Sequence, residues 1–305
     1  MTPQTEYLLR QIGDGLDHGV FPEVHDGGLV WPARAAVNSQ PPGQEYQNEK
    51  SKPAPAAQSW QTGASGTAAP GTPGTAAPGT PGDTGSSGSA PSIACHNRGI
   101  SGLVQAVTSA YLGTEVVETR DAVWLRAPAS LLPNLGYRGI FVLAIVPAWG
   151  VVRGWGFWEY GILGMRPIGP RHTNYGDASI CAFDHRDGTW LYGNSLVSLL
   201  DLYAVWAVRH LYLHHIGRWP GPQGAFSPFE RLREYRDDEW CGCDNPVGRY
   251  AACCKGRDRQ LLTRAGHEYL AQALLPRSVP LGVAAFAEGM APSPLTYDVR
   301  GPLFR

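Results

Sequence analysis

The chain has 305 residues, of which 43% are hydrophobic and 17% charged, and its formal net charge at pH 7 is −1. This balance argues against a general nucleic-acid-binding protein, because neutralising phosphates requires an excess of basic residues. The sequence has no run of 18 apolar residues, and its first residues lack the basic start and apolar core of a signal peptide. We therefore expect a soluble, cytoplasmic protein rather than a membrane or secreted one.

The first 37 residues contain too few large apolar side chains for a core of their own. A short helix is expected from Thr5 to Ile12, and scattered apolar residues follow as far as Trp31. Two interpretations stay open for residues 1–37. The segment is either a tethered docking peptide or a piece that completes the fold of another protein.

Residues 38–93 have the composition of a disordered linker. From 63 to 92 the chain contains only Gly, Ala, Ser, Thr and Pro apart from Asp83, and the eight residues that start at Gly66 are repeated from Gly74. Such a segment cannot bury enough apolar area to offset its ordering entropy. The folded part is therefore expected after it, with a main domain at 94–222 and an extension at 223–305.

The main domain is predicted to be α+β. A helix from Ile100 to Leu112 is expected to bury one apolar face. Three β-rich runs separated by turn residues follow: Glu115–Glu118 continuing to Ala122–Arg126, Gly139–Val146 and Trp155–Leu163. A helix capped by Asn194 or Ser195 should then run to Ile216 and stop at Gly217, with apolar residues on two sides.

A single cysteine, Cys181, lies before the long helix among residues suited to thiol chemistry. His172 and Asn174 precede it by nine and seven residues, and Trp190 follows nine residues later. A thiolate is nucleophilic near neutral pH and leaves readily, so a thiol can take a carboxyl terminus from another thioester. The Asn174 amide could stabilise an oxyanion or brace the loop, and His172 is expected to hold the loop through its ring.

The order of these residues resembles the ubiquitin-conjugating enzyme family, and its bacterial members in particular. In that family a His-Pro-Asn motif follows the fourth strand, an Ile-Cys carries the catalytic thiol, and a Trp precedes a helix. The matching residues here are His172-Thr173-Asn174, Ile180-Cys181 and Trp190, with Thr173 in place of Pro. Further matches are Tyr137-Arg138-Gly139 at the start of the third strand and Gly217-Arg218-Trp219-Pro220-Gly221 after the long helix. The resemblance covers residues 98–222.

This resemblance implies a UBC-like fold: an N-terminal helix, an antiparallel four-stranded meander, an active-site cysteine loop and a long C-terminal helix. It implies a carrier that receives a ubiquitin-like protein on Cys181 from an activating enzyme and passes it to a lysine of a protein target. Several bacterial systems of this kind are linked to phage defence. Catalytic roles would fall to Cys181, Asn174 and His172, and Asp184 or Asp187 would orient the incoming lysine.

Two other functions stay open on the sequence. One is a catalytically inactive binding scaffold, in which Cys181 is buried and the fold only engages a partner. The other is a cysteine-dependent hydrolase, which needs a histidine aimed at the thiol.

Four cysteines fall within 14 residues and predict a metal site: Cys241, Cys243, Cys253 and Cys254. Thiolates at this spacing suit tetrahedral zinc with a structural role. The Cys-x-Cys and Cys-Cys pairs, with Tyr250 before the second, resemble the zinc-binding SEC-C motif. Residues 230–259 carry seven basic and seven acidic side chains, so we expect this knuckle to contact protein rather than nucleic acid.

His210 and His214 stand one turn apart on the long helix, a spacing also found in zinc hydrolases. Leu211 rather than Glu follows His210. Core packing or pairing with the end of the helix is therefore expected for them.

Overall fold

The computed structural model of the chain describes residues 2–20, 23–25, 28–30, 93–132, 136–159, 165–174, 176–183, 189–224, 228–243, 248–264 and 277–290. Residues 1–33 and 91–305 form one compact unit and residues 34–90 another. All described residues belong to the first unit. The expected linker, apart from Ile93, lies outside the described residues.

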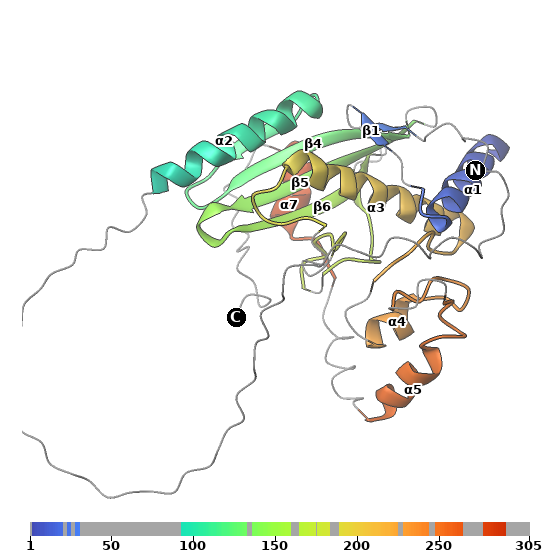
Figure 1. Cartoon of the computed structure of the whole chain (residues 1–305). Helices are drawn as coiled ribbons and strands as arrows, with labels where there is room; N and C mark the ends of the chain where they lie inside the picture. Colours follow the sequence, from blue (N-terminus) through green and yellow to red (C-terminus); the bar gives the residue numbers. More distant parts are fainter. Residues whose placement is uncertain are drawn as a thin grey trace, which may run out of the picture. The chain divides into compact units, whose positions relative to one another are not determined.

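A five-stranded antiparallel sheet, ordered β3-β4-β5-β6-β7, lies at the centre of this unit (Figure 1). The strands are β3 (Glu115–Glu118), β4 (Val123–Leu132), β5 (Tyr137–Val146), β6 (Val151–Glu159) and β7 (Met165–Pro167). The predicted α+β class is confirmed, whereas the predicted count of four strands is wrong. The first predicted strand is in fact a hairpin, because Thr119 Oγ1 accepts from Ala122 N (3.1 Å) and donates to Ala122 O (2.9 Å), which closes a turn between β3 and β4.

Two glycines let a helix approach β6 closely. An added Cβ at Gly154 would lie 2.2 Å from the Tyr203 ring, and one at Gly156 would lie 2.9 Å from the Trp206 ring. In sequence these glycines suggest an interruption, so the strand was expected to begin at Trp155. It begins at Val151 instead. The two glycines do not interrupt the strand, because they leave room for the aromatic rings of α3 to pack on it.

The long helix α3 (Leu196–Ile216) packs on one face of the sheet. Its predicted caps are confirmed: Ser195 Oγ accepts from Ser198 N (3.3 Å), and Gly217 ends the helix in the left-handed region at φ 87°. By length and composition alone α3 could cross a membrane, but 61% of its apolar 18-residue stretch is buried inside the protein. Such burial is typical of the core helix of a globular domain.

Helix α2 (Ile93–Ala110) begins earlier than predicted and lies beside α3 at one end of the sheet (Figure 1). Its expected apolar face is confirmed, since Val107 and the following Tyr111 are buried and Leu103 and Val104 pack against the same core. The Tyr111 hydroxyl donates to Asp201 of α3 (2.7 Å). A 3-10 turn, η2 (Pro147–Trp149), connects β5 to β6.

The N-terminal helix α1 (Pro3–Asp17) packs against α3 as part of the same compact unit. Leu9, Ile12 and Leu16 are buried in the core that α3 shares with the sheet. The interpretation of residues 1–37 as a tethered docking peptide therefore does not describe this helix. Its apolar stripe is too small for an independent core but large enough to extend an existing one. A hairpin of β1 (Glu23–His25) and β2 (Gly28–Val30) follows.

Helix α7 (Leu281–Ala287) packs near the opposite face of the sheet (Figure 1). The sequence analysis placed no helix in this part of the extension, because a helix of two turns has too weak a periodic pattern. Helices α4 (Pro228–Glu234) and α5 (Lys255–Arg264) flank the cysteine cluster, and they are joined by a buried ion pair between Arg231 and Asp258 (2.8 Å). Residues 265–276 lie outside the described residues.

Candidate active site and metal centre

The segment between β7 and α3 folds back on itself around the predicted thiol. Thr173 and Ile180 form an antiparallel bridge, and Cys181 N donates to His172 O (2.9 Å) next to it. His172 and Cys181 are therefore neighbours across a short paired stretch, although nine residues separate them in sequence.

Asn174 lies on the other side of that bridge and binds Ser179 twice. Its backbone N donates to Ser179 O (2.7 Å), and its Nδ2 donates to Ser179 Oγ (3.0 Å). Ala178 N returns a hydrogen bond to Asn174 O (3.1 Å). In this structure the Asn174 side chain therefore braces the turn that leads to Cys181.

Asp177, inside that turn, is a site residue that the sequence did not single out. Its Oδ1 accepts from Ser179 N (3.0 Å) and Oγ (2.8 Å), and its other oxygen pairs with Arg153 of β6. Its backbone oxygen accepts from Trp155 Nε1 (2.9 Å). An Asp two residues before a Ser is a recognised turn signal, so the local bond was predictable although the ion pair was not.

Cys181 is half-buried and is not part of a disulfide bond. The residue before it is fixed to the sheet, because Ile180 N donates to Gly154 O (2.7 Å). Burial raises the pKa of the Tyr203 hydroxyl, and electrostatic interaction with Cys181 raises it further. The Tyr203 hydroxyl on α3 is therefore neutral at pH 7.

His172 is buried and has a φ of 50°, in the left-handed region. Its ring centroid lies 4.8 Å from that of Trp219, and its Nε2 bonds with Gln223 Oε1 (3.1 Å). Burial, helped by the charge of Arg171, lowers the pKa of His172 to about 3. The imidazole is therefore neutral at pH 7, and its Nε2–H donates a hydrogen bond to Gln223 Oε1.

His210 occupies a similar environment on α3. Its ring lies between those of Trp206 (4.5 Å) and Trp219 (5.0 Å), and its Nε2 donates to Arg171 O (2.8 Å). Burial lowers the pKa of His210 to about 3. The core-packing role expected for His210 is confirmed.

The remaining predicted site residues, Asp184 and Asp187, lie outside the described residues. Their suggested role toward an incoming lysine stays a prediction.

The four clustered cysteines do converge. The sulfur atoms of Cys241, Cys243, Cys253 and Cys254 all lie within 4.8 Å of one another, and among the described residues they form the one such group of potential metal ligands. The backbone builds this site as a small hairpin, in which Cys241 N donates to Gly248 O (2.9 Å) and Trp240 bridges to Arg249. Helix α5 begins directly after Cys254.

The geometry and chemistry of this cluster fit a tetrahedral metal ion. With Zn–S bonds of about 2.3 Å, the sulfurs of a tetrahedral site are about 3.8 Å apart. The Cys243–Cys253 and Cys253–Cys254 sulfur separations are 3.3 and 3.8 Å. Burial raises the pKa of the Cys241 thiol, whereas a bound cation favours the thiolate, so the four sulfurs could hold a metal ion and release protons on binding it.

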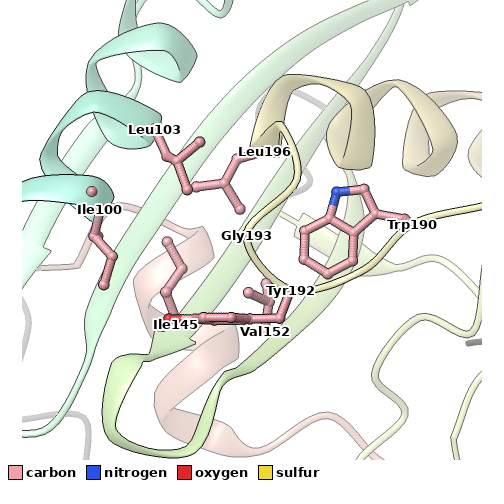
Figure 2. A pocket seen from close by; sticks show the side chains of 9 residues that line it. Ile100, Leu103, Ile145, Val152, Trp190, Tyr192, Gly193 and Leu196 are labelled. Carbon is pink, nitrogen blue, oxygen red and sulfur yellow. The ribbon is translucent and has the colours of Figure 1, made fainter. Parts of the chain in front are cut away.

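An apolar pocket of about 430 Å³ opens beside the segment that follows Cys181. Figure 2 shows side chains from several elements around this space: Ile100 and Leu103 of α2, Ile145 of β5, Val152 of β6, Trp190, Tyr192 and Leu196. Trp190, which the sequence marked, also packs its ring 5.6 Å from that of Phe183. One wall of the pocket therefore belongs to the same stretch of chain as the thiol.

Comparisons of the chain with protein-family models, with curated proteins and with solved structures found no match.

Proposed function

We propose that this protein is a ubiquitin-conjugating-like carrier, which accepts a ubiquitin-like protein on Cys181 and transfers it to a lysine amine of a protein target. The observation that carries the proposal is the pairing of residues 172–174 with 179–181. This pairing sets a half-buried thiol after an antiparallel meander and before a long core helix. The matching order of His172, Asn174, Cys181 and Trp190 gives the arrangement its interpretation.

The chemistry consists of two acyl transfers. First, the Cys181 thiolate attacks the thioester carbonyl of the charged activating enzyme. A new C–S bond forms while the old one breaks, and the enzyme's sulfur leaves as a thiolate. Second, a lysine amine attacks the Cys181 thioester. The C–N bond forms, Cys181 leaves as a thiolate, and the amine proton passes to solvent.

In this proposal His172 and Asn174 are positioning residues. His172 holds the backbone that pairs with Cys181, and Asn174 braces the intervening turn through Ser179. Asp177 joins them, because its ion pair with Arg153 ties the turn to β6. A thiol held this way keeps one orientation while two large proteins dock around it.

A cysteine hydrolase is less well supported by the described residues. Such an enzyme needs a histidine that can take the proton of a thiol, whose ordinary pKa is about 8.5. His172 pairs with Cys181 along the backbone, but its Nε2 is bonded to Gln223 and its pKa is lowered to about 3. A base that weak cannot convert an appreciable fraction of the thiol to thiolate.

We assign zinc to the four-cysteine cluster, with a structural role. Four thiolates fill a tetrahedral site and leave no position for substrate. When bound, the ion would cross-link Cys241 and Cys243 of the hairpin to Cys253 and Cys254, which directly precede α5. Free thiols and such a cluster persist in a reducing compartment, so we place the protein in the cytoplasm.

The proposed partners are an activating enzyme, a ubiquitin-like protein and a lysine-bearing target protein. Thioester formation on Cys181 tests the proposal. The full-length protein is incubated with a bacterial ubiquitin-activating-like enzyme, its ubiquitin-like protein and ATP, then run on a non-reducing gel. We expect an adduct that thiol reagents remove from the wild type and that is absent from Cys181→Ala. In Cys181→Ser a thiol-resistant ester should accumulate instead.

A charged activating enzyme that yields no adduct on this chain would contradict the carrier function. A Cys181 that also resists alkylation in the native protein would then favour the binding scaffold. A Cys181-dependent release of the ubiquitin-like protein from an isopeptide substrate would favour the hydrolase.

A further inference from the structure

We propose that metal binding by the four-cysteine cluster holds the Cys181 segment in its conformation, through Glu239 and Gln223. The inference concerns control of the proposed active site, and its consequence for catalysis rests on the proposed function. The structural coupling itself does not depend on that function. The cluster and Cys181 are about sixty residues apart in sequence, so the connection exists only in the fold.

Glu239, two residues before the cluster ligand Cys241, provides the first link. Its side chain is fully buried and pairs with both terminal nitrogens of Arg171, one at 2.9 Å. It also accepts from Trp219 N (2.6 Å) and Arg236 N (3.0 Å). The Glu239 backbone belongs to the hairpin that carries the cysteines, so the position of this carboxylate depends on that hairpin.

Gln223 provides the second link. Its Nε2 donates to Trp240 O in the cysteine hairpin (2.9 Å). Its Oε1 accepts from Arg171 Nη2 (2.9 Å) and from His172 Nε2 (3.1 Å). The Gln223 amide therefore forms hydrogen bonds with the cysteine hairpin and with the start of the Cys181 segment.

The hairpin and Gln223 also fit closely at the backbone. Gly242 lies between the ligands Cys241 and Cys243 and has a φ of +68°. An added Cβ there would lie 2.0 Å from Gln223 O. Because backbones meet at this point, a shift of the hairpin cannot be absorbed by a side-chain rotation alone.

From Arg171 the connection runs to the backbone of Cys181. Arg171 is buried, with its guanidinium 5.3 Å from the Trp219 ring and 5.0 Å from the Tyr235 ring. The next residue, His172, accepts the backbone hydrogen bond of Cys181 (2.9 Å). If Glu239 moved away, a buried cation would lose its carboxylate partner, so the Arg171–His172 backbone would have to rearrange.

The metal matters here because the apolar core of the cysteine hairpin itself is small. Its apolar core consists of Tyr235, Tyr250, Cys241 and Cys254, with Leu232, Cys243 and Cys253 packed against them. Most of that core is made of the ligands themselves. Metal binding would therefore supply much of the free energy that holds this hairpin in its conformation.

Hydrogen–deuterium exchange of the full chain, before and after zinc removal by a chelator, tests the coupling. Metal analysis should give one zinc per chain before treatment and none after. Backbone amides of residues 171–181 should then exchange at least tenfold faster, while those of β5 keep their rates. Peptide-level mass spectrometry should show the alkylation rate of Cys181 change at least threefold.

The variant Glu239→Gln tests the Glu239 link while leaving the four metal ligands unchanged. This variant should keep one zinc per chain and still show the faster exchange at 171–181, whereas Glu118→Gln, at an exposed position on β3, should match the wild type. If Glu239→Gln does not fold, as judged by circular dichroism, zinc removal from the wild type decides alone.

Unchanged exchange at 171–181 in the zinc-free chain would overturn the proposal. So would equal loss of protection in β5, because the metal would then stabilise the whole molecule and not the segment. Failure to form a thioester on zinc-loaded protein would refute the proposed function and leave this exchange result standing.

Discussion

Several charged side chains in this protein are buried beside a partner of opposite charge, with each partner under a tenth exposed. Such pairs include Arg153–Asp177, Arg171–Glu239 and Arg231–Asp258. A buried ion pair adds little net stability over a well-packed apolar pair, but loss of one partner leaves a charge in a poorly solvating interior. At the scale of single residues, these pairs select one conformation for the segments that they join.

Asp177→Asn tests this for the turn before Cys181. The amide oxygen can still accept from Ser179, so the main change is that the buried guanidinium of Arg153 faces a neutral group. We expect the free energy of unfolding, measured by chemical denaturation, to fall by about 3 kcal/mol. Glu6→Gln, in the exposed pair with Arg10, should leave the midpoint unchanged. Equal effects of the two substitutions would contradict this role for Asp177.

The two buried histidines predict how stability depends on pH. His172 and His210 have pKa values near 3 in the folded protein and about 6.5 when unfolded. The unfolded chain therefore binds more protons below pH 6.5, and stability is lost as the pH falls from 6.5 toward 3. Each histidine contributes up to about 1.4 kcal/mol per pH unit. His210→Gln keeps a donor for Arg171 O. It should remove the contribution of one histidine from the dependence of unfolding free energy on pH, about 1.4 kcal/mol per pH unit. An unchanged slope would contradict these assignments.

At the scale of elements, helix packing decides where glycine is needed. Gly13 lies in α1 where an added Cβ would stand 2.1 Å from the Tyr212 ring of α3. Gly102 lies in α2, with no atom within 4 Å of such a Cβ. Both residues are helical, but only Gly13 allows two helices to approach closely.

The same substitution at these two glycines should have opposite effects. Gly102→Ala should stabilise the protein by about 0.5–1 kcal/mol, because alanine loses less backbone entropy in a helix. Gly13→Ala should destabilise it by about 1–3 kcal/mol, because the methyl group overpacks the contact with Tyr212. Thermal unfolding measures both changes. Stabilisation by Gly13→Ala would mean that α1 does not pack on α3 as described.

Elements with strong local signals could be predicted from the sequence. The β5 strand was expected at Gly139–Val146 and spans Tyr137–Val146, and α3 was expected with the caps and end that it has. Errors arose where tertiary contacts override local patterns. Val123 begins a strand of its own because Thr119 closes a turn, and β6 continues through its glycines because α3 packs on them.

The candidate site likewise contains residues that the sequence predicts and residues that it does not. The four cysteines and the neighbours of Cys181 were evident because they are close in sequence and rare in type. The ion pair of Arg171 with Glu239 spans 68 residues and involves common residue types. Nothing in a single sequence marks such a pair, since only the fold brings its members together.

At the scale of the whole molecule, the sheet has an apolar core on each face. One core joins the sheet to α1, α2 and α3, and the other joins it to α7. Trp155 belongs to the second core, and its indole N–H donates to Asp177 O (2.9 Å). Helix α7 therefore shares a core with a residue that is hydrogen-bonded to the Cys181 segment.

Substitutions on the two sides of α7 test this packing. Phe286 is buried beside the tryptophans of the second core, whereas Leu281 on the same helix is 89% exposed. Phe286→Ala should lower the free energy of unfolding by about 3–5 kcal/mol, through lost burial and a residual cavity. Leu281→Ala should change it by less than about 0.5 kcal/mol.

Tryptophan fluorescence and chemical denaturation report both quantities. The stacked rings of Trp124 and Trp155, 6.2 Å apart, belong to the same core as Phe286, so loss of Phe286 should admit water to that core and shift their emission to longer wavelength. Equal denaturation midpoints and spectra for the two variants would mean that α7 does not cover this face. The Cys181 turn would then depend on the core formed with α3 and on the cysteine hairpin.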